Sequence, residues 1–249
     1  MPHHPRIDPL QRQRIQERAL RQGPKWNQAR AWLPIIDDHL LEAAADLPCP
    51  HATDALVLDD GTNSLSARLH GRAEHVVSAR LGGDIPFRPQ GYDLIISLPF
   101  LHSQDEPVAA LSLLRAMLRP GGFALVAAYA QGSLENFRAC FQEAELALTG
   151  GLSPRFHPLP SAAGLAQWGQ EAGFPSVVAT QERLSWPCHH VTDLAHSLRA
   201  IGATNCLADR PRQPAPRRLF DRAQSLYAQG DYPPHISINL TVLVLGTGI

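Results

Sequence analysis

Two apolar segments of strand length, separated by a helical segment, constrain the fold more than any other feature. They are residues 92–100 (YDLIISLPF) and 123–129 (FALVAAY). Residues 106–122 between them carry Pro107 near the first turn, and the Pro-Gly-Gly of residues 120–122 is expected to stop the helix. Strands this apolar occur where helices cover both faces of a mainly parallel sheet. The chain is therefore expected to be an α/β protein.

The rest of the chain alternates strands and helices in the same way. Further strands are predicted at 55–58, 74–81, 176–187 and 236–246. Further helices are predicted at 9–21, 27–46, 133–147, 161–174, 191–203 and 216–230. Ser133, Ser161 and Thr192 are the expected N-cap residues of three of them, and Gly173 the expected stop of one.

Composition excludes several classes of function. The chain has 249 residues, a formal net charge of -1 and a hydrophobic content of 44%. No basic field therefore favours nucleic acid, and no apolar run has the length for membrane insertion. The four cysteines are dispersed without Cys-x-x-Cys spacing, which predicts no metal site and a cytoplasmic location.

Residues 55–69 (ALVLDDGTNSLSARL) have the order of a nucleotide-binding strand, loop and helix. In such a loop, glycines let the backbone approach the ligand. Here Gly61 is the only glycine, and Asp59 and Asp60 precede it. An ordinary strand-to-helix turn would also favour Gly and Asn, so this reading stays open beside the cofactor loop.

The segments YDLIISLPFLH, LLRAMLRPGGFALVAAY and QGSLENFRACFQEAE resemble class I S-adenosylmethionine-dependent methyltransferases. SLRAIGATN and YPPHISINLTVLVLG are similar to one branch of these, the malonyl-carrier-protein O-methyltransferase of biotin synthesis and the methyltransferase-like complex I assembly factor. Residues 150–174 resemble the assembly-factor members. The resemblance extends over roughly residues 7–246.

The resemblance implies a Rossmann-like, doubly wound, mainly parallel sheet of seven strands whose last strand is antiparallel. It implies an N-terminal helical extension in residues 1–50 and a methyltransferase-fold domain in residues 51–249. Helical, substrate-side insertions are expected within residues 150–220.

The resemblance also implies a site for S-adenosylmethionine. The family loop has an acid, an apolar residue and then Gly-x-Gly-x-Gly; Val57 takes the acidic position, and Asp59, Gly61 and Asn63 take the glycine positions. Strand two should end in an acid, and none stands at 78–80. The residues implied in cofactor binding are Asp59, Gly61, Asn63, Ser78, Asp84, Ile85 and Ser97. With these departures, cofactor binding is expected to be weak or lost.

His102 follows the predicted strand 92–100, and Tyr129 ends the predicted strand 123–129. Both are expected substrate-side residues, although a lone His is more often structural. The expected methyl transfer requires no residue of the chain to act as a nucleophile. An acidic carrier protein or a partner subunit could dock on the arginines Arg210, Arg212, Arg217 and Arg218. A solvated arginine loop is the alternative and the more common case.

Two functions follow from the resemblance. Because acids and glycines of the cofactor motifs are missing, the resemblance does not decide whether the chain is an enzyme. The first is methyl transfer to a carrier-protein thioester or a protein subunit. The alternative is a non-catalytic or repurposed assembly factor that binds a respiratory complex I subunit. Members of the assembly-factor branch hydroxylate an arginine, which is a third reaction type.

Overall fold

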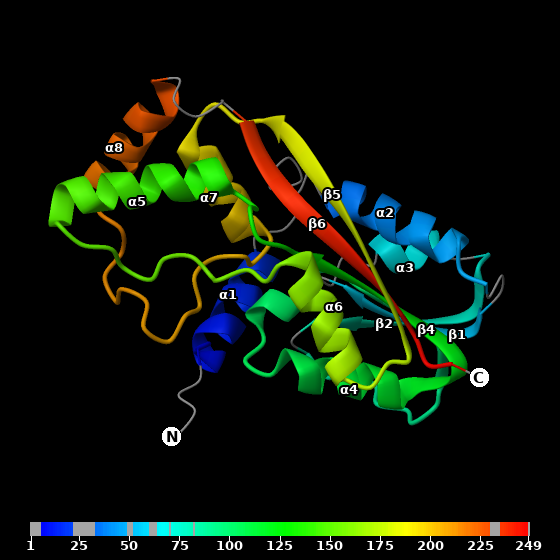
Figure 1. Cartoon of the computed structure of the whole chain (residues 1–249). Coiled ribbons are helices and arrows are strands. Elements are labelled where there is room, and N and C mark those ends of the chain that lie inside the picture. Colours follow the sequence, from blue (N-terminus) through cyan, green and yellow to red (C-terminus); the bar gives the residue numbers. More distant parts are fainter. Residues whose placement is uncertain are drawn as a thin grey trace. The chain divides into compact units, whose positions relative to one another are not determined.

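The computed structural model describes residues 6–21, 33–48, 52–59, 64–69, 71–81, 83–229 and 235–248. The chain divides into two compact units. The first comprises residues 1–31, 132–158 and 183–239 and is mainly helical. The second comprises residues 32–131, 159–182 and 240–249 and holds most of a β-sheet. Figure 1 shows the elements of both units.

The sheet of the described residues has six strands in the order β2-β1-β3-β4-β6-β5. The strands are β1 Ala52–Asp59, β2 Ala73–Arg80, β3 Tyr92–Ser97, β4 Leu118–Tyr129, β5 Ser176–Pro187 and β6 His235–Gly246. Strand β1 pairs in parallel with β2 and β3, and β3 pairs in parallel with β4. Strand β6 is antiparallel to β4. The six predicted strands and the antiparallel last strand are confirmed.

A seventh strand, which the resemblance implied, is absent from the described residues. The reason lies in the short connection between β2 and β3. Strand β2 ends at Arg80 and β3 begins at Tyr92, and one crossover between parallel strands already needs about a dozen residues. Residues 81–91 therefore return the chain to the start of β3 without room for a further strand.

Helices cover both faces of the sheet, as the apolar strands predicted (Figure 1). On one face lie α2 (Leu33–Ala45) and α3 (Ser64–Arg68), which contact β4 and β1. On the other lie the 3-10 helix η2 (Leu101–Ser103), α4 (Pro107–Met117) and α6 (Ala162–Glu171). Side chains of α4, α6 and the strands form one buried core there.

The Pro-Gly-Gly of residues 120–122 does not stop α4, contrary to the prediction. Helix α4 ends at Met117, and β4 already begins at Leu118, which pairs with Tyr92. The register between β3 and β4 then shifts before Phe123, and Gly121 has a φ of +78°. Proline and glycine are tolerated at such an irregular strand start. These residues form a bulge in β4 instead of a helix stop.

The predicted N-caps have mixed outcomes. Ser161 caps α6 by accepting the backbone N–H of Gly164, and Gly173 adopts a φ of +85° after that helix, as predicted. Ser133 does not cap the next helix, because its hydroxyl instead accepts the backbone N–H of Asn239 at 3.0 Å. Thr192 lies inside its helix, which begins one residue earlier.

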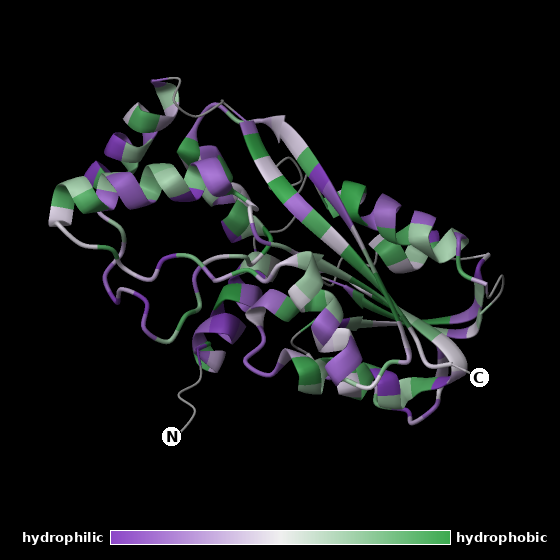
Figure 2. Ribbon diagram, in the orientation of Figure 1, coloured by the Kyte–Doolittle hydropathy of each residue, from purple (hydrophilic) through white to green (hydrophobic). Residues whose placement is uncertain are grey.

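The helical unit contains α1 (Pro9–Arg21), α5 (Glu135–Thr149), α7 (Val191–Ala200) and α8 (Arg217–Ala228). Hydrophobic and hydrophilic residues alternate along these helices (Figure 2). Helix α5 packs on α8, and α1 packs on α7. Aromatic rings join α5, α8 and the loop after α5: Phe137, Phe141, Phe156 and Phe220. No described helix has the length and apolar character needed to cross a membrane.

Candidate functional site

The parallel strands β1, β2, β3 and β4 end at the same edge of the sheet, and several predicted site residues stand there. Asp59 is the last residue of β1, and Tyr129 is the last residue of β4. Ser97 ends β3 and lies beside Leu58 of β1 in the register. Ligands of open α/β sheets bind outside this edge. The tertiary structure thus brings Asp59 and Tyr129, which are 70 positions apart in the sequence, to the same edge of the sheet.

Asp59 is buried and is held by Ser78. Only 1% of Asp59 is exposed, and its Oδ2 accepts the hydroxyl of Ser78 on the neighbouring strand at 3.1 Å. Its backbone carbonyl accepts the N–H of Leu81. A buried carboxylate with its hydrogen-bond donor therefore stands where the family pattern has glycine. Gly61 and Asn63, the other two predicted loop residues, lie outside the described residues.

A second buried carboxylate, which sequence reasoning missed, lies on the α2 side of this edge. Asp37 of α2 is 2% exposed and accepts the hydroxyl of Ser64, the first residue of α3, at 2.9 Å. Asp37 lies between the apolar positions Ile36 and Leu40 on the buried side of α2. An acid on the apolar side of a helix was the signal available in the sequence. Asp37 anchors the beginning of α3.

Asp84 and Ile85 follow the carboxyl end of β2. Asp84 is exposed, whereas Ile85 is half-buried and packs against the core that α4 and α6 share with the sheet. Ser97 differs from both because it is fully buried. Its hydroxyl donates to the carbonyl of Leu98 at 3.0 Å. Of these three predicted cofactor residues, Asp84 is the one whose side chain reaches solvent most freely.

The two predicted substrate-side residues meet in space. His102 lies on η2 after β3, and Tyr129 ends β4. Their ring centroids are 5.2 Å apart with planes tilted by 49°, a common geometry for aromatic pairs. Both residues are half-buried. They form an aromatic wall at the same edge of the sheet, with a polar imidazole and a polar hydroxyl.

The described residues contain no group of three or more His, Cys, Asp or Glu side chains placed to hold a metal ion. Cys140, Cys188 and Cys206 are free and buried. Burial, together with the nearby charge of Glu143, raises the pKa of Cys140 to about 11. Burial also raises the pKa of Cys188. These two thiols are therefore protonated at neutral pH and poorly suited to act as nucleophiles.

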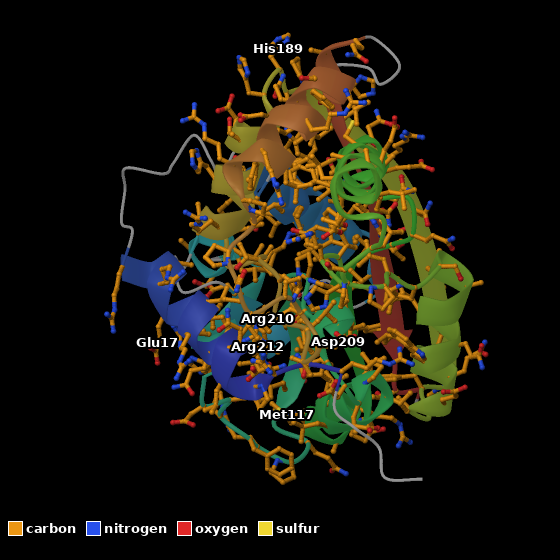
Figure 3. The ribbon with its side chains drawn as sticks, turned by 90° about the vertical axis from the view of Figure 1, so that its left-hand side faces the viewer. Glu17, Met117, His189, Asp209, Arg210 and Arg212 are labelled. Atoms are coloured by element: carbon orange, nitrogen blue, oxygen red, sulfur yellow. The ribbon has the colours of Figure 1, made fainter. Side chains whose placement is uncertain are left out.

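The arginine-rich loop before α8 is partly tied down within the helical unit. Arg210 donates to Asp8 at 2.9 Å and to the carbonyl of Leu207 at 2.8 Å. Arg212 lies close by on the same loop (Figure 3), 3.8 Å from Asp8 and 73% exposed. The backbone N–H of Gln11 and the guanidinium of Arg210 lower the pKa of Asp8. Arg210 thus has a structural role, while Arg212 faces solvent.

No family model matches the sequence. Among curated proteins, the chain is 26% identical over 126 residues to the mitochondrial arginine-hydroxylase NDUFAF5 of Homo sapiens, covering 51% of this chain and 36% of that protein. It is 27% identical over 146 residues to the malonyl-[acyl-carrier protein] O-methyltransferase of Xylella fastidiosa, covering 57% and 46%. The chain thus spans less than half the length of these two relatives.

Solved structures agree on the fold. The YcgJ protein from Bacillus subtilis superposes with a TM-score of 0.53 at 10% identity, covering 84% of this chain and 98% of its own. A SAM-dependent methyltransferase from Thermotoga maritima superposes with a TM-score of 0.50 at 15% identity, covering 94% and 98%. The chain thus has the fold of class I S-adenosylmethionine-dependent methyltransferases, and its sequence is similar to the NDUFAF5 arginine hydroxylases and the malonyl-[acyl-carrier protein] O-methyltransferases.

Proposed function

We propose that the protein binds S-adenosylmethionine weakly at the carboxyl edge of the sheet and transfers its methyl group to an acceptor presented by another protein. The observation that carries this proposal is the gathering of Asp59, Asp84 and the His102–Tyr129 pair at one edge. Cofactors of open α/β sheets bind at that edge. Asp59, Gly61, Asn63, Ser78, Asp84, Ile85 and Ser97 are the proposed cofactor residues.

The residues fit the cofactor in part. Asp84 is exposed just beyond β2, where it can accept a hydrogen bond from an adenine amino group. Asp59 and Ser78 bond each other, so the first glycine position carries a Cβ and a carboxylate. Val57 and Ser78 supply no carboxylate for the ammonium or the ribose hydroxyls. Each missing charged hydrogen bond costs about 1.5–3 kcal/mol, which lowers affinity by about a hundredfold or more for two.

The acceptor class follows from the relatives. One group of relatives is named for arginine hydroxylation, and the other for a malonyl group on an acyl-carrier protein. Both names describe a group carried by a protein, so a carrier-protein thioester or a side chain of a protein subunit is the proposed acceptor. His102 and Tyr129 would line its approach. The three free, buried cysteines among the described residues suit a reducing compartment, and we propose a cytoplasmic location.

A second function is favoured by the bond between Asp59 and Ser78, which satisfies two side chains of the cofactor edge without a ligand. In this alternative, the chain is a non-catalytic or repurposed assembly factor that keeps the fold and binds a subunit of respiratory complex I. Arginine hydroxylation of that subunit is the remaining reaction type. Measured cofactor affinity separates the two functions.

The test is calorimetric titration with S-adenosylhomocysteine. The wild-type protein should bind with a Kd above roughly 100 μM, a binding free energy of only about 5.5 kcal/mol. Asp59→Gly should tighten binding about tenfold, because it removes a bulky, desolvated carboxylate from a position that normally lacks a Cβ. Adding Ser78→Asp should tighten it further through the ribose hydroxyls.

Glu74→Gly is the matched control, since Glu74 is an exposed acid at the amino end of β2 and should leave the affinity unchanged. Low-micromolar binding by wild type that Asp59→Gly weakens would identify Asp59 as a substitute ligand for the ammonium group. Failure of every variant to bind would instead support the non-catalytic assembly factor.

A further inference from the structure

A groove of about 1100 Å³ lies on the α2 face of the sheet, within the sheet-containing unit. It runs between α2 and the strands β5 and β6, and none of the proposed site residues lines it. Its lining reaches Gly121 at the start of β4 and Gly246 at the end of β6. Because β6 is antiparallel to β4, both residues lie at the amino end of the parallel strands. Toward the carboxyl end the lining includes Leu240, which pairs with Tyr129, so the groove runs along the α2 face of the sheet and differs from the candidate cofactor edge in its lining residues.

The floor of the groove is apolar. Phe123 of β4, Val242 and Val244 of β6, and Val178 of β5 contribute to it. Strand β5 shows the asymmetry of the sheet most clearly. Val177 packs against the core shared with α4 and α6, whereas Val178 on the opposite face is 51% exposed. Strand β5 is also an edge strand of the described sheet. An apolar hollow beside an open edge is typical of a binding surface.

The rim of the groove is acidic. Glu42 and Asp46 on α2 and Glu182 on β5 supply three carboxylates. His39 lies between two of them, 3.4 Å from Glu182 and 3.7 Å from Glu42. None of the 18 described residues that line the groove is Lys or Arg, although the whole chain holds 22. Apart from His39, the described lining of the groove therefore offers no basic side chain to neutralise the negative charge around the apolar floor.

We propose that this groove docks a segment of a partner protein whose apolar side chains are flanked by Arg or Lys. The apolar side chains would cover Val178 and Val242, and the cations would face Glu42, Asp46 and Glu182. Complementary charge selects such a segment, while an acidic segment or an anionic membrane surface meets like charge. This surface goes beyond the proposed function, because it requires neither bound cofactor nor catalysis.

Fluorescence anisotropy with two synthetic 14-residue amphipathic peptides tests the proposal. Both peptides carry Leu on one side, with Arg on the flank of the first and Glu on the flank of the second. The Arg peptide should bind the wild-type chain at least about tenfold more tightly than the Glu peptide, and added salt should reduce the difference. Glu42→Lys with Glu182→Lys should weaken the Arg peptide about tenfold. Val178→Asp should weaken both peptides.

The matched control is Glu74→Lys with Glu106→Lys, two exposed acids outside the groove, which should leave peptide binding unchanged. Circular dichroism confirms that each variant folds. Equal affinity for both peptides, or Arg-peptide binding that survives Val178→Asp, overturns the proposal. A dimer in sedimentation velocity that Val178→Asp dissociates also overturns it, in favour of a second copy as occupant. S-adenosylhomocysteine affinity should be the same in Val178→Asp and wild type, so this test and that of the proposed function fail independently.

Discussion

The two ends of the sheet use acidic side chains in opposite ways. At the amino end, Arg119 donates to Asp54 at 2.7 Å and to Asp93 at 2.8 Å, and Asp93 also accepts the backbone N–H groups of Thr53 and Asp54 at 2.9 Å. At the carboxyl end, Asp59 accepts the hydroxyl of Ser78, and Asp84 is exposed. The amino-end carboxylates bind an arginine and backbone N–H groups and so join strands, whereas the carboxylate of Asp84 is exposed near the candidate cofactor edge.

The pKa values follow this difference. Burial alone would raise the pKa of Asp93, but the backbone N–H groups of Asp54 and Thr53 and the guanidinium of Arg119 outweigh it and lower the pKa. The same two carboxylates raise the pKa of Arg119. Asp93 and Arg119 are thus charged at neutral pH, and the amino-end cluster connects the beginnings of β1, β3 and β4. Its removal should affect stability, while changes at the carboxyl end should affect binding.

The largest expected effect comes from Asp93→Ala. It removes a partly buried acceptor of three hydrogen bonds, and, with allowance for partial exposure, should lower the free energy of unfolding by about 2 kcal/mol. The melting temperature should fall by about 4–8 °C for a chain of this size. Thermal denaturation followed by circular dichroism measures this. S-adenosylhomocysteine affinity should not change, and a loss of affinity as large as the loss of stability would remove the distinction between the two ends.

The next effect is a loss of stability in acid. The pKa of Asp93 is lowered in the folded protein, so its contribution is complete above its unfolded pKa, near 4, and is lost as the pH falls through the lowered folded value. Glu145 behaves alike, because Arg155 and the backbone N–H of Ser153 outweigh its burial and lower its pKa. Urea unfolding at pH 7, 5, 4 and 3 should show the loss mainly below pH 5. Asp93→Asn should reduce this dependence, and an unchanged dependence would exclude Asp93 as its source.

Asp84→Ala should show the opposite pattern to Asp93→Ala. Asp84 is exposed and four residues beyond β2, so the melting temperature should move by less than about 1 °C. Loss of one hydrogen bond to the adenine amino group should weaken S-adenosylhomocysteine binding about five- to tenfold, which calorimetry or competition binding can measure. Asp105→Ala is a matched exposed control after β3. Unchanged affinity in Asp84→Ala would remove Asp84 from the proposed site.

The smallest effect concerns the aromatic pair. A double-mutant cycle with His102→Ala and Tyr129→Ala should give a coupling free energy of about 0.5–1 kcal/mol in unfolding, as expected for rings in contact. Phe137→Ala and Phe141→Ala form a comparison cycle for a ring pair inside the helical unit, with centroids 4.6 Å apart. Zero coupling between His102 and Tyr129 would mean that they act as separate residues.

Local pattern was enough for much of the fold. Apolar strand segments and helical periodicity predicted all six described strands, the helices between them and the covered sheet. Ser161 was predictable as an N-cap because its bond reaches only to Gly164. Ser133 was not, because its partner Asn239 is 106 positions away. The Pro-Gly-Gly of β4 was misread for the same reason, since pairing with β3 decides whether that segment bends a strand or stops a helix.

The candidate site shows the same difference between what the sequence determines and what the tertiary structure determines. The sequence by itself determined which residue types stand at the strand ends, including the missing glycines at Asp59 and Asn63. Only the tertiary structure decided what they contact: Asp59 with Ser78, Asp37 with Ser64, and His102 with Tyr129. The physical reason is that periodicity is set by neighbours a few residues apart. Contacts between strand ends depend instead on strand order and register, which form only when the whole sheet assembles.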